Sequence, residues 1–174
     1  MRRLLLFVPL GLFAALAWFL FKGLSLDPKE LPSALIGKQV PAFRATILDS
    51  QQPVDQSVFE GEPRLLNVWG TWCPTCVAEH PYLMRLAGQG VRIVGLNYKD
   101  TDSKAIAWLG RLGDPYEVVI RDPEGMIGLD LGVYGAPETY VIDAEGVVRY
   151  RHVGEVNDRT WNGALGEAYR ALLP

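Results

Sequence analysis

Cysteine and histidine are scarce in this sequence, with two of each among 174 residues. Cys73 and Cys76 lie three positions apart. A disulfide between them cannot join distant parts of a fold, so a framework of structural disulfides is disfavoured. A zinc ion needs about four ligands, and the chain offers only these cysteines, His80 and the remote His152, without a second paired motif. A zinc site and a purely structural disulfide are therefore the weaker interpretations, and no metal is expected.

An excess of positive charge is also missing. The chain carries 17 basic and 20 acidic residues, and residues 22–174 hold 15 basic residues against the same 20 acidic ones. The absence of a basic stripe argues against nucleic acid as a partner. The composition, with 49% hydrophobic and 21% charged residues and no internal repeat, fits one globular domain.

Charged residues are absent from a stretch near the N-terminus, directly after Arg2 and Arg3. The 18 residues from 4 to 21 carry no charge. As a helix they would be about 27 Å long, close to the thickness of a bilayer's hydrocarbon core. The arginine pair predicts that the N-terminus stays in the cytoplasm while the rest of the chain lies outside. A cleaved signal peptide is the alternative, but the small-x-small site at residues 15–17 lies inside the apolar run. We therefore expect an uncleaved anchor.

The predicted organisation has three parts. Residues 1–22 form a membrane anchor with its helix over 4–21, residues 23–36 form a linker, and residues 37–174 form the globular domain. The domain is expected in an exported compartment, where the redox state of thiols matters.

Strand and helix patterns alternate along the globular domain. Short apolar runs predict strands at 64–69, 91–98, 116–120, 139–143 and 147–153. Helical spacing of apolar residues predicts helices at 73–87, 102–112, 126–131 and 161–172. The last two strands form a hairpin closed by residues 143–146. This order predicts an α/β fold with a mixed β-sheet flanked by helices.

The two cysteines follow a predicted strand and open a predicted helix. At a helix N-terminus, unpaired backbone N–H groups and the helix dipole stabilise a thiolate, which favours Cys73 as the attacking group. Pro74 suits the first helical position because it has no N–H to leave unpaired. Cys76, about one turn later, faces inward and can attack a mixed disulfide formed by Cys73. A thiol peroxidase is a weaker interpretation, because Gly70 stands where such an enzyme needs Thr or Ser.

Longer segments around the cysteines resemble a known family. Residues 65–81 read LLNVWGTWCPTCVAEHP, residues 132–143 read GVYGAPETYVID, and residues 36–43 read IGKQVPAF. Together they resemble the CcmG/DsbE-type thioredoxin-like proteins of cytochrome c maturation, over nearly all of residues 30–172. The resemblance implies a thioredoxin-like fold.

The same resemblance implies roles for residues near the dithiol. Pro137 would be a cis-proline that faces the cysteines, and the backbone of Ala136 would pair with an extended substrate. Glu79 would accept the proton of Cys76, since Asn67 stands where many thioredoxins have a buried Asp. The alternative for Glu79 is a carboxylate that is merely stabilised by the helix dipole.

Several residues are predicted to line a substrate groove: Trp72, Pro74, Thr75, Tyr134, Ala136, Pro137 and Glu138. Trp72 would shield the sulfurs. Packing beside the groove is the alternative for Tyr134, and a solvated surface position is the equal alternative for Glu138. We expect His80 to be a surface residue or a helix-packing residue rather than a ligand or a base.

The function implied by the resemblance is disulfide reduction in the bacterial periplasm by a protein with a single span in the inner membrane. The predicted substrate is the haem-site disulfide of apocytochrome c, or a partner thiol protein of cytochrome c maturation. A membrane electron-transfer thiol protein of the DsbD/CcdA type would restore the dithiol. No cofactor, metal or nucleic acid is implied. The alternatives are a broad-range disulfide reductase or isomerase, and a non-catalytic binding module of the same fold.

Overall fold

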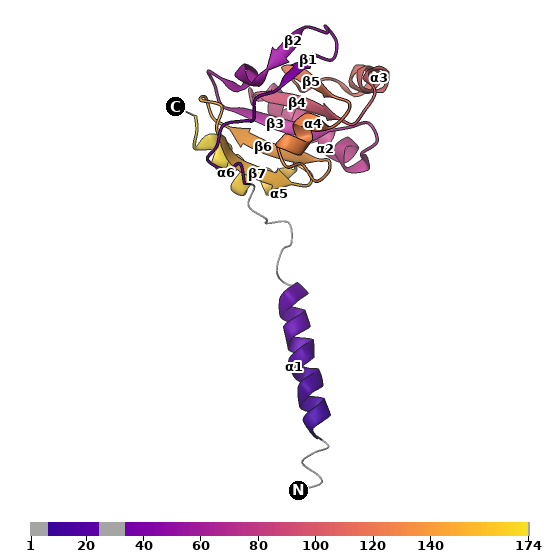
Figure 1. Cartoon of the computed structure of the whole chain (residues 1–174), viewed down its shortest axis with the longest axis vertical. Coiled ribbons are helices and arrows are strands. Elements are labelled where there is room, and N and C mark those ends of the chain that lie inside the picture. Colours follow the sequence, from indigo (N-terminus) through magenta and orange to yellow (C-terminus); the bar gives the residue numbers. More distant parts are fainter. Residues whose placement is uncertain (1–6, 25–33, 174) are drawn as a thin grey trace. The chain divides into compact units, whose positions relative to one another are not determined.

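The structure, a computed structural model, describes residues 7–24 and 34–173 (Figure 1). The chain divides into two compact units, residues 1–31 and 32–174, and each is described by itself.

The first unit contains helix α1, which spans Phe7–Leu24. Within the described residues, no helix has the length and hydropathy that crossing a membrane would require. Arg2, Arg3 and the first residues of the predicted span, 4–6, lie outside the described residues, as does most of the predicted linker, 25–33.

A five-stranded mixed sheet forms the centre of the second unit. Its strands are β3 (Arg64–Trp69), β4 (Ile93–Tyr98), β5 (Val118–Asp122), β6 (Glu138–Ile142) and β7 (Val148–Val153). Their spatial order is β5-β4-β3-β6-β7. The first three strands in this order are parallel, and β6 is antiparallel to both β3 and β7. The predicted α/β fold is confirmed, although β5 begins at Val118 rather than at residue 116.

Successive side chains of β3 point to opposite faces of the sheet, as the alternation of a strand requires. Leu65 and Trp69 join one hydrophobic cluster, and Leu66 and Val68 join another. Asn67 lies between the first pair and is also fully buried. A polar side chain therefore sits on the core face of the central strand, just before the predicted dithiol.

Helices cover both faces of this sheet (Figure 1). The helices α2 (Pro74–Gly88), α3 (Asp102–Leu112) and α6 (Ala164–Arg170) supply side chains to the cluster that contains Trp69. Helix α4 (Met126–Asp130) packs with the cluster on the other face. The helix predicted over 102–112 has the bounds of α3, because its apolar residues follow a clear helical spacing.

Residues 44–59 form small elements that the sequence patterns do not predict. Strands β1 (Arg44–Thr46) and β2 (Pro53–Asp55) pair in an antiparallel two-stranded sheet, and the short 3-10 helix η1 (Gln56–Phe59) follows. Strands of three residues are too short to show a period of two, so pattern alone misses them.

The single helix predicted at the C-terminus is wrong. The chain forms α5 (Asp158–Trp161) and then α6, with a break at Gly163. Asn157 caps α5 by accepting a hydrogen bond from the backbone N–H of Thr160 at 3.1 Å, while Oγ1 of Thr160 accepts one from the N–H of Asn157 at 2.9 Å. Within α6, a Cβ at Gly166 would lie 1.9 Å from the carbonyl oxygen of Trp161, so the close approach of α5 to α6 needs a glycine there.

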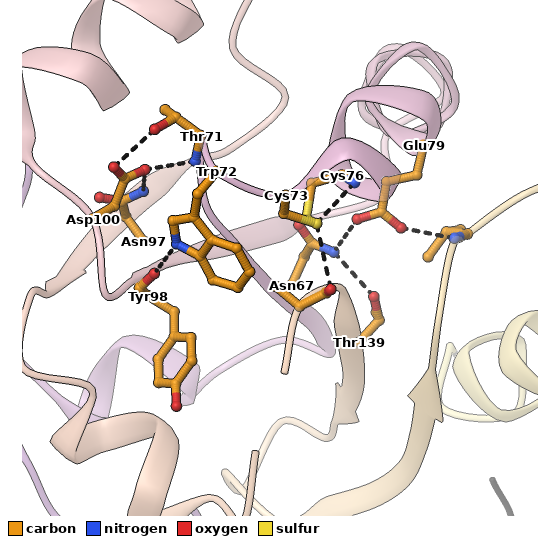
Figure 2. The surroundings of a disulfide bond; sticks show 12 residues. Asn67, Thr71, Trp72, Cys73, Cys76, Glu79, Asn97, Tyr98, Asp100 and Thr139 are labelled. Carbon is orange, nitrogen blue, oxygen red and sulfur yellow. Dashed lines mark hydrogen bonds between the residues drawn. A yellow bond between two sulfur atoms is a disulfide. The ribbon is translucent and has the colours of Figure 1, made fainter. Parts of the chain in front are cut away.

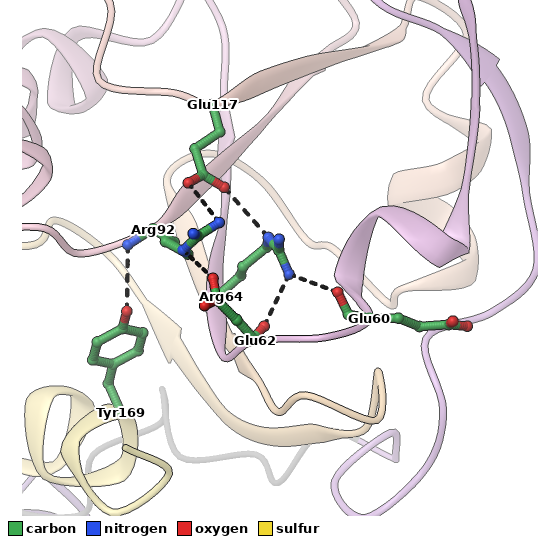
Figure 3. Close-up of polar contacts among 6 residues, drawn as sticks. All are labelled: Glu60, Glu62, Arg64, Arg92, Glu117 and Tyr169. Carbon is green, nitrogen blue, oxygen red and sulfur yellow. Dashed lines mark hydrogen bonds and ion pairs between the residues drawn. The ribbon is translucent and has the colours of Figure 1, made fainter. Parts of the chain in front are cut away.

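An ionic cluster lies at the amino ends of β3 and β4 (Figure 3). Glu117 pairs with Arg64 at 3.4 Å and with Arg92 at 3.2 Å, and Arg92 also pairs with Glu62. The backbone N–H of Arg92 donates to the hydroxyl of Tyr169 at 3.3 Å, which ties α6 to the sheet. Each partly exposed ion pair contributes about 0–1 kcal/mol. This cluster is structural and lies at the end of the strands opposite to the one that precedes the cysteines.

Candidate active site

The two cysteines lie at the start of α2, directly after β3 and a short turn. Cys73 is the N-cap residue, and its Sγ accepts a hydrogen bond from the backbone N–H of Cys76 at 3.1 Å. The cysteines form a disulfide with a Cα–Cα distance of 5.3 Å. The predicted position of Cys73 at the helix N-terminus is confirmed. The same amide of Cys76 is placed to stabilise a thiolate at Cys73 once the disulfide is reduced.

Both cysteines are buried in this oxidised state, with only 2% of each exposed. The inward position predicted for Cys76 is confirmed. Pro74 and Thr75, which separate the cysteines, are exposed, and 49% of Trp72 is exposed as well. Solvent and partners therefore meet the dithiol from the side of Trp72, Pro74 and Thr75.

The turn before Cys73 is held by Asp100, which follows β4. Its carboxylate accepts hydrogen bonds from Thr71, through the backbone N–H at 2.6 Å and Oγ1 at 2.8 Å, and from Nδ2 of Asn97 at 3.2 Å (Figure 2). The backbone N–H of Thr101 also donates to this carboxylate, at 2.8 Å. Burial alone would raise the pKa of Asp100, but these donors outweigh it and hold that pKa below its usual value. Asp100 carries no recognisable signal in the sequence, because its role depends on the contact between two neighbouring strand ends.

The indole of Trp72 is fixed beside the disulfide. Its Nε1–H donates to the carbonyl oxygen of Tyr98 at 3.0 Å (Figure 2). The ring also passes close to the backbone of Gly70, where a Cβ would lie 2.4 Å from Nε1. The indole can therefore occupy this position only because Gly70 has no side chain.

We expect Gly70→Ala to displace the indole and break the hydrogen bond between Trp72 and Tyr98. The loss should be about 1 kcal/mol in the free energy of unfolding, with a changed near-ultraviolet circular dichroism signal from tryptophan. The matched control is Gly88→Ala near the end of α2, where a Cβ would meet nothing within 4 Å. Equal stability of the two variants would show that Gly70 does not position Trp72.

Pro137 follows a cis peptide bond with Ala136, as predicted. The carbonyl oxygen of Ala136 lies 3.4 Å from Sγ of Cys73, so the backbone before the proline faces the disulfide. Ala136 is half-buried, Pro137 is buried, and β6 begins immediately after them at Glu138. An extended substrate lying against Ala136 would therefore reach Cys73.

Glu79 is buried on α2, with 1% of the residue exposed. Its Oε1 accepts a hydrogen bond from Nδ2 of Asn67 at 3.0 Å, and its Oε2 accepts one from the backbone N–H of Val156 at 2.8 Å (Figure 2). Burial raises the pKa of Glu79 from 4.5 to about 7, and the two hydrogen bonds only partly oppose this rise. A carboxyl group with this pKa both takes up and releases a proton near neutral pH.

Asn67 joins Glu79 to a wider buried network. Its Nδ2 also donates to Oγ1 of Thr139 at 3.1 Å, and its Oδ1 accepts a hydrogen bond from the hydroxyl of Tyr116 at 2.9 Å. Burial raises the pKa of Tyr116 well above its ordinary value, and the nearby Glu79 adds to this rise. The sequence predicts strands that begin at Thr139 and at Tyr116 but no role for either residue at the site, because both lie far from Asn67 along the chain. The network fixes Asn67 and, through it, one oxygen of Glu79.

Glu138 does not reach the surface, since only 1% of it is exposed. The alternative of a solvated Glu138 is therefore wrong, and its side chain does not line a groove directly. Its Oε1 accepts a hydrogen bond from the N–H of Tyr134 at 2.8 Å, and its Oε2 pairs with Nη2 of Arg151 at 2.8 Å. The hydroxyl of Tyr140 donates to the same Oε2 at 3.0 Å. From its buried position, Glu138 thus fixes the backbone of the segment that precedes Pro137.

Tyr134 is 73% exposed, and the guanidinium of Arg151 lies 4.6 Å from the centre of its ring. The tyrosine is therefore available at the surface next to the segment with the cis-proline. Its predicted part in a substrate groove stays a prediction.

His80 packs in the core, so the helix-packing alternative is confirmed and the surface alternative is wrong. It is 2% exposed, its Nε2 lies 3.0 Å from the carbonyl oxygen of Gly113, and its ring meets that of Trp108 edge-on at 4.3 Å. Burial lowers the pKa of His80, although the contact with Gly113 opposes this. In the part of the chain that the structure describes, no group of three or more His, Cys, Asp and Glu side chains is placed to hold a metal ion.

Comparisons with known proteins agree with this geometry. The Redoxin family model matches residues 35–168. The chain is 53% identical over 174 residues to the thiol:disulfide interchange protein DsbE of Pseudomonas aeruginosa, covering 99% of this chain and 97% of that protein. It is 54% identical over 168 residues to DsbE of Escherichia coli K12, covering 92% and 91%. Among solved structures, a thio-disulfide isomerase from Thermus thermophilus matches with a TM-score of 0.62 at 26% identity, over 76% of this chain and 96% of that one.

Proposed function

Because the chain belongs to the Redoxin family and, within it, to the DsbE-type thiol:disulfide interchange proteins, we propose that it is the reductant of haem-site disulfides in apocytochrome c or of a partner thiol protein in that pathway. The chain is a thiol–disulfide oxidoreductase with its dithiol at Cys73 and Cys76. The observation that supports the proposal best is Cys73 as N-cap of α2, with the carbonyl oxygen of Ala136 3.4 Å from its sulfur.

The reaction starts from the reduced dithiol. The thiolate of Cys73 bonds to one sulfur of the substrate disulfide and expels the other sulfur as a thiolate, which takes up a proton from solvent. Cys76 then loses its proton, bonds to the sulfur of Cys73 and expels the second substrate sulfur. Two electrons pass to the substrate, which leaves as a dithiol, and the bond between Cys73 and Cys76 forms.

Glu79 supplies the proton acceptor for the second step in this proposal. It lies three residues after Cys76 on the same helix, and it is buried with a pKa of about 7. A base with a pKa near the working pH is the most effective proton acceptor. Asn67 and Val156 hold its two oxygens, so the carboxyl group is oriented before the reaction begins.

The substrate lies extended against the segment that precedes Pro137. The backbone of Ala136 is half-buried beside Cys73, and Trp72 and Tyr134 expose aromatic rings in the same region of the chain's fold. An extended peptide gains affinity from backbone pairing and selectivity from the side-chain contacts on either side. A haem-site segment with two closely spaced cysteines fits this mode, because its disulfide closes only a short loop and can present one sulfur to Cys73.

The test has two parts: the rates at which the purified, reduced chain reduces two peptides, and the level of c-type cytochromes in cells that lack the protein. We expect faster reduction of a peptide with a Cys-x-x-Cys-His disulfide than of the same residues in scrambled order, and loss of c-type cytochromes when the protein is deleted. Equal rates for both peptides, with c-type cytochromes unaffected by deletion, would instead indicate a broad-range disulfide reductase or isomerase. Electrons would return to the dithiol from a membrane thiol protein of the DsbD/CcdA type.

We further propose that residues 4–21 anchor the protein in the inner membrane with the thioredoxin-like domain in the periplasm. The support is the uncharged run from 4 to 21 after Arg2 and Arg3. The full chain is expected to stay with membranes through an alkaline carbonate wash, whereas a chain lacking residues 1–22 is expected in the soluble fraction. Release of the full chain by carbonate, or a mature N-terminus just after Ala17, would contradict the anchor.

A further inference from the structure

A groove of about 890 Å³ opens beside the dithiol, with Trp72 in its wall. Its other walls include Lys99, Lys104, Arg111 and Glu124. Trp72 directly precedes Cys73, so the groove begins where a substrate sulfur must arrive. A protein joined to Cys73 in a mixed disulfide therefore has neighbouring residues within reach of these walls.

One wall of the groove is cationic and belongs to α3. Lys104, Ala107 and Arg111 share one face of this helix, because they follow one another at three and four residues. Lys104 and Arg111 are both exposed, and neither takes part in an ion pair among the described residues. The small side chain of Ala107 leaves the space between the two charges open.

The acidic groups of the groove neutralise its cations only in part. The carboxylate of Asp100 keeps its charge while it accepts hydrogen bonds from Thr71, Asn97 and Thr101. Asp100 and Glu124 stand against the three cations Lys99, Lys104 and Arg111, which leaves the lining with a net charge of +1. Residues 22–174 carry more acidic than basic residues overall, so a cationic groove next to the dithiol is a local exception.

The spacing of the cations suggests what would fit them. Lys104 and Arg111 are seven residues apart on α3, which corresponds to about 10 Å along the helix axis. Side chains of an extended segment share a face at every second residue, so carboxylates on one face stand two or four residues apart, about 7 or about 13 Å. Two carboxylates four residues apart would therefore meet both cations, because the long side chains of Lys104 and Arg111 cover the difference in length.

We propose that this groove is the docking surface for an acidic, extended segment of the protein that exchanges disulfides with Cys73. Lys104 and Arg111 contact its carboxylates, with Ala107 between them on α3, and Trp72 supplies apolar surface to the same lining. This inference rests on the proposed function, and it adds that the partner's segment next to its disulfide is negatively charged. Charges at the rim of an interface act mainly on the rate of association.

The experiment uses the reduced full chain and two disulfide peptides. Both carry one Cys-x-x-Cys disulfide. On either side of it, one peptide has two glutamates four residues apart, and the other peptide has glutamines at the same positions. We expect the glutamate peptide to react about tenfold faster at low salt. This preference should disappear in 1 M salt, where the Debye length is about 3 Å, and in the double variant Lys104→Glu, Arg111→Glu.

The control variant is Lys38→Glu, Arg44→Glu, which changes the net charge equally at exposed positions outside the groove. It should keep the preference for the glutamate peptide. Reduction of hydroxyethyl disulfide, a small neutral substrate, should proceed equally in all three proteins. Equal rates for the two peptides, or a preference that survives in Lys104→Glu, Arg111→Glu, would overturn the docking surface. Failure of the wild-type chain to reduce any of these disulfides would overturn the thiol–disulfide function itself.

Discussion

Cys73→Ser is expected to reduce disulfide exchange to the uncatalysed background. Serine keeps the size of the side chain, but its hydroxyl does not form the anion that attacks sulfur. The measurement is the rate of reduction of a disulfide peptide by the prereduced full-length chain. Retention of a rate well above background would show that Cys73 is not the attacking group, and it would favour a binding module that does not turn over.

Cys76→Ser provides the matching control, because it removes the resolving thiol and leaves the attacking one. This variant should react once and then accumulate as a mixed disulfide between Cys73 and the substrate, visible by mass spectrometry under non-reducing conditions. The roles would be reversed if the adduct formed with Cys73→Ser instead.

Glu79 is expected to make the free energy of unfolding fall as pH rises from about 4.5 to about 7. Its pKa in the folded chain is about 7, against 4.5 for an exposed glutamate. The folded state therefore binds more protons than the unfolded state between these values. The stabilisation is fully present below pH 4.5 and is lost as pH rises through 7. The difference between these pKa values corresponds to about 3 kcal/mol.

The measurement is denaturant unfolding of the oxidised chain at several pH values, for the wild type and for Glu79→Gln. Comparing the two isolates this group, because the lowered pKa of His80 acts with the opposite sign in a similar range. Glu167→Gln, a change at an exposed position on α6, should leave the pH dependence of the wild type intact. Parallel pH profiles for the wild type and Glu79→Gln would show that Glu79 does not titrate in this range.

The same variant tests the role of Glu79 as proton acceptor. Loss of a general base commonly slows a step by about 10² or more. Glu79→Gln should therefore slow the resolution of the mixed disulfide by Cys76, while the first attack by Cys73 remains close to the wild-type rate. Slowing of both steps to the same degree would indicate a structural role only.

The parts of the fold with strong local periodicity follow from the sequence. Helix α3 has the predicted bounds because its apolar residues repeat along one face, and the strands around the cysteines are apolar and flanked by turns. The break between α5 and α6 does not follow from spacing alone. It depends on the capping box at Asn157 and on the close approach of Trp161 to Gly166, which is a contact in three dimensions.

The dithiol, the cis-proline and Glu79 could be predicted because they lie in short segments with a recognisable pattern. Asp100 and Tyr116 could not, because each acts on a residue that is far away in the sequence, Thr71 and Asn67 respectively. The burial of Glu138 was also not predictable. A glutamate beside a loop is expected at the surface, and its burial depends on the pairing with Arg151 and on the hydrogen bonds from Tyr134 and Tyr140.

The reduction potential of the Cys73–Cys76 pair tests the reductant assignment most directly. It is obtained by equilibrating the full-length chain with defined ratios of reduced and oxidised glutathione and then counting free thiols. A reductant should have a potential between about −180 mV and about −270 mV, the range from protein disulfide isomerase to thioredoxin. A potential near about −120 mV, typical of a strong oxidant, would contradict the proposal that this chain donates electrons to its substrates.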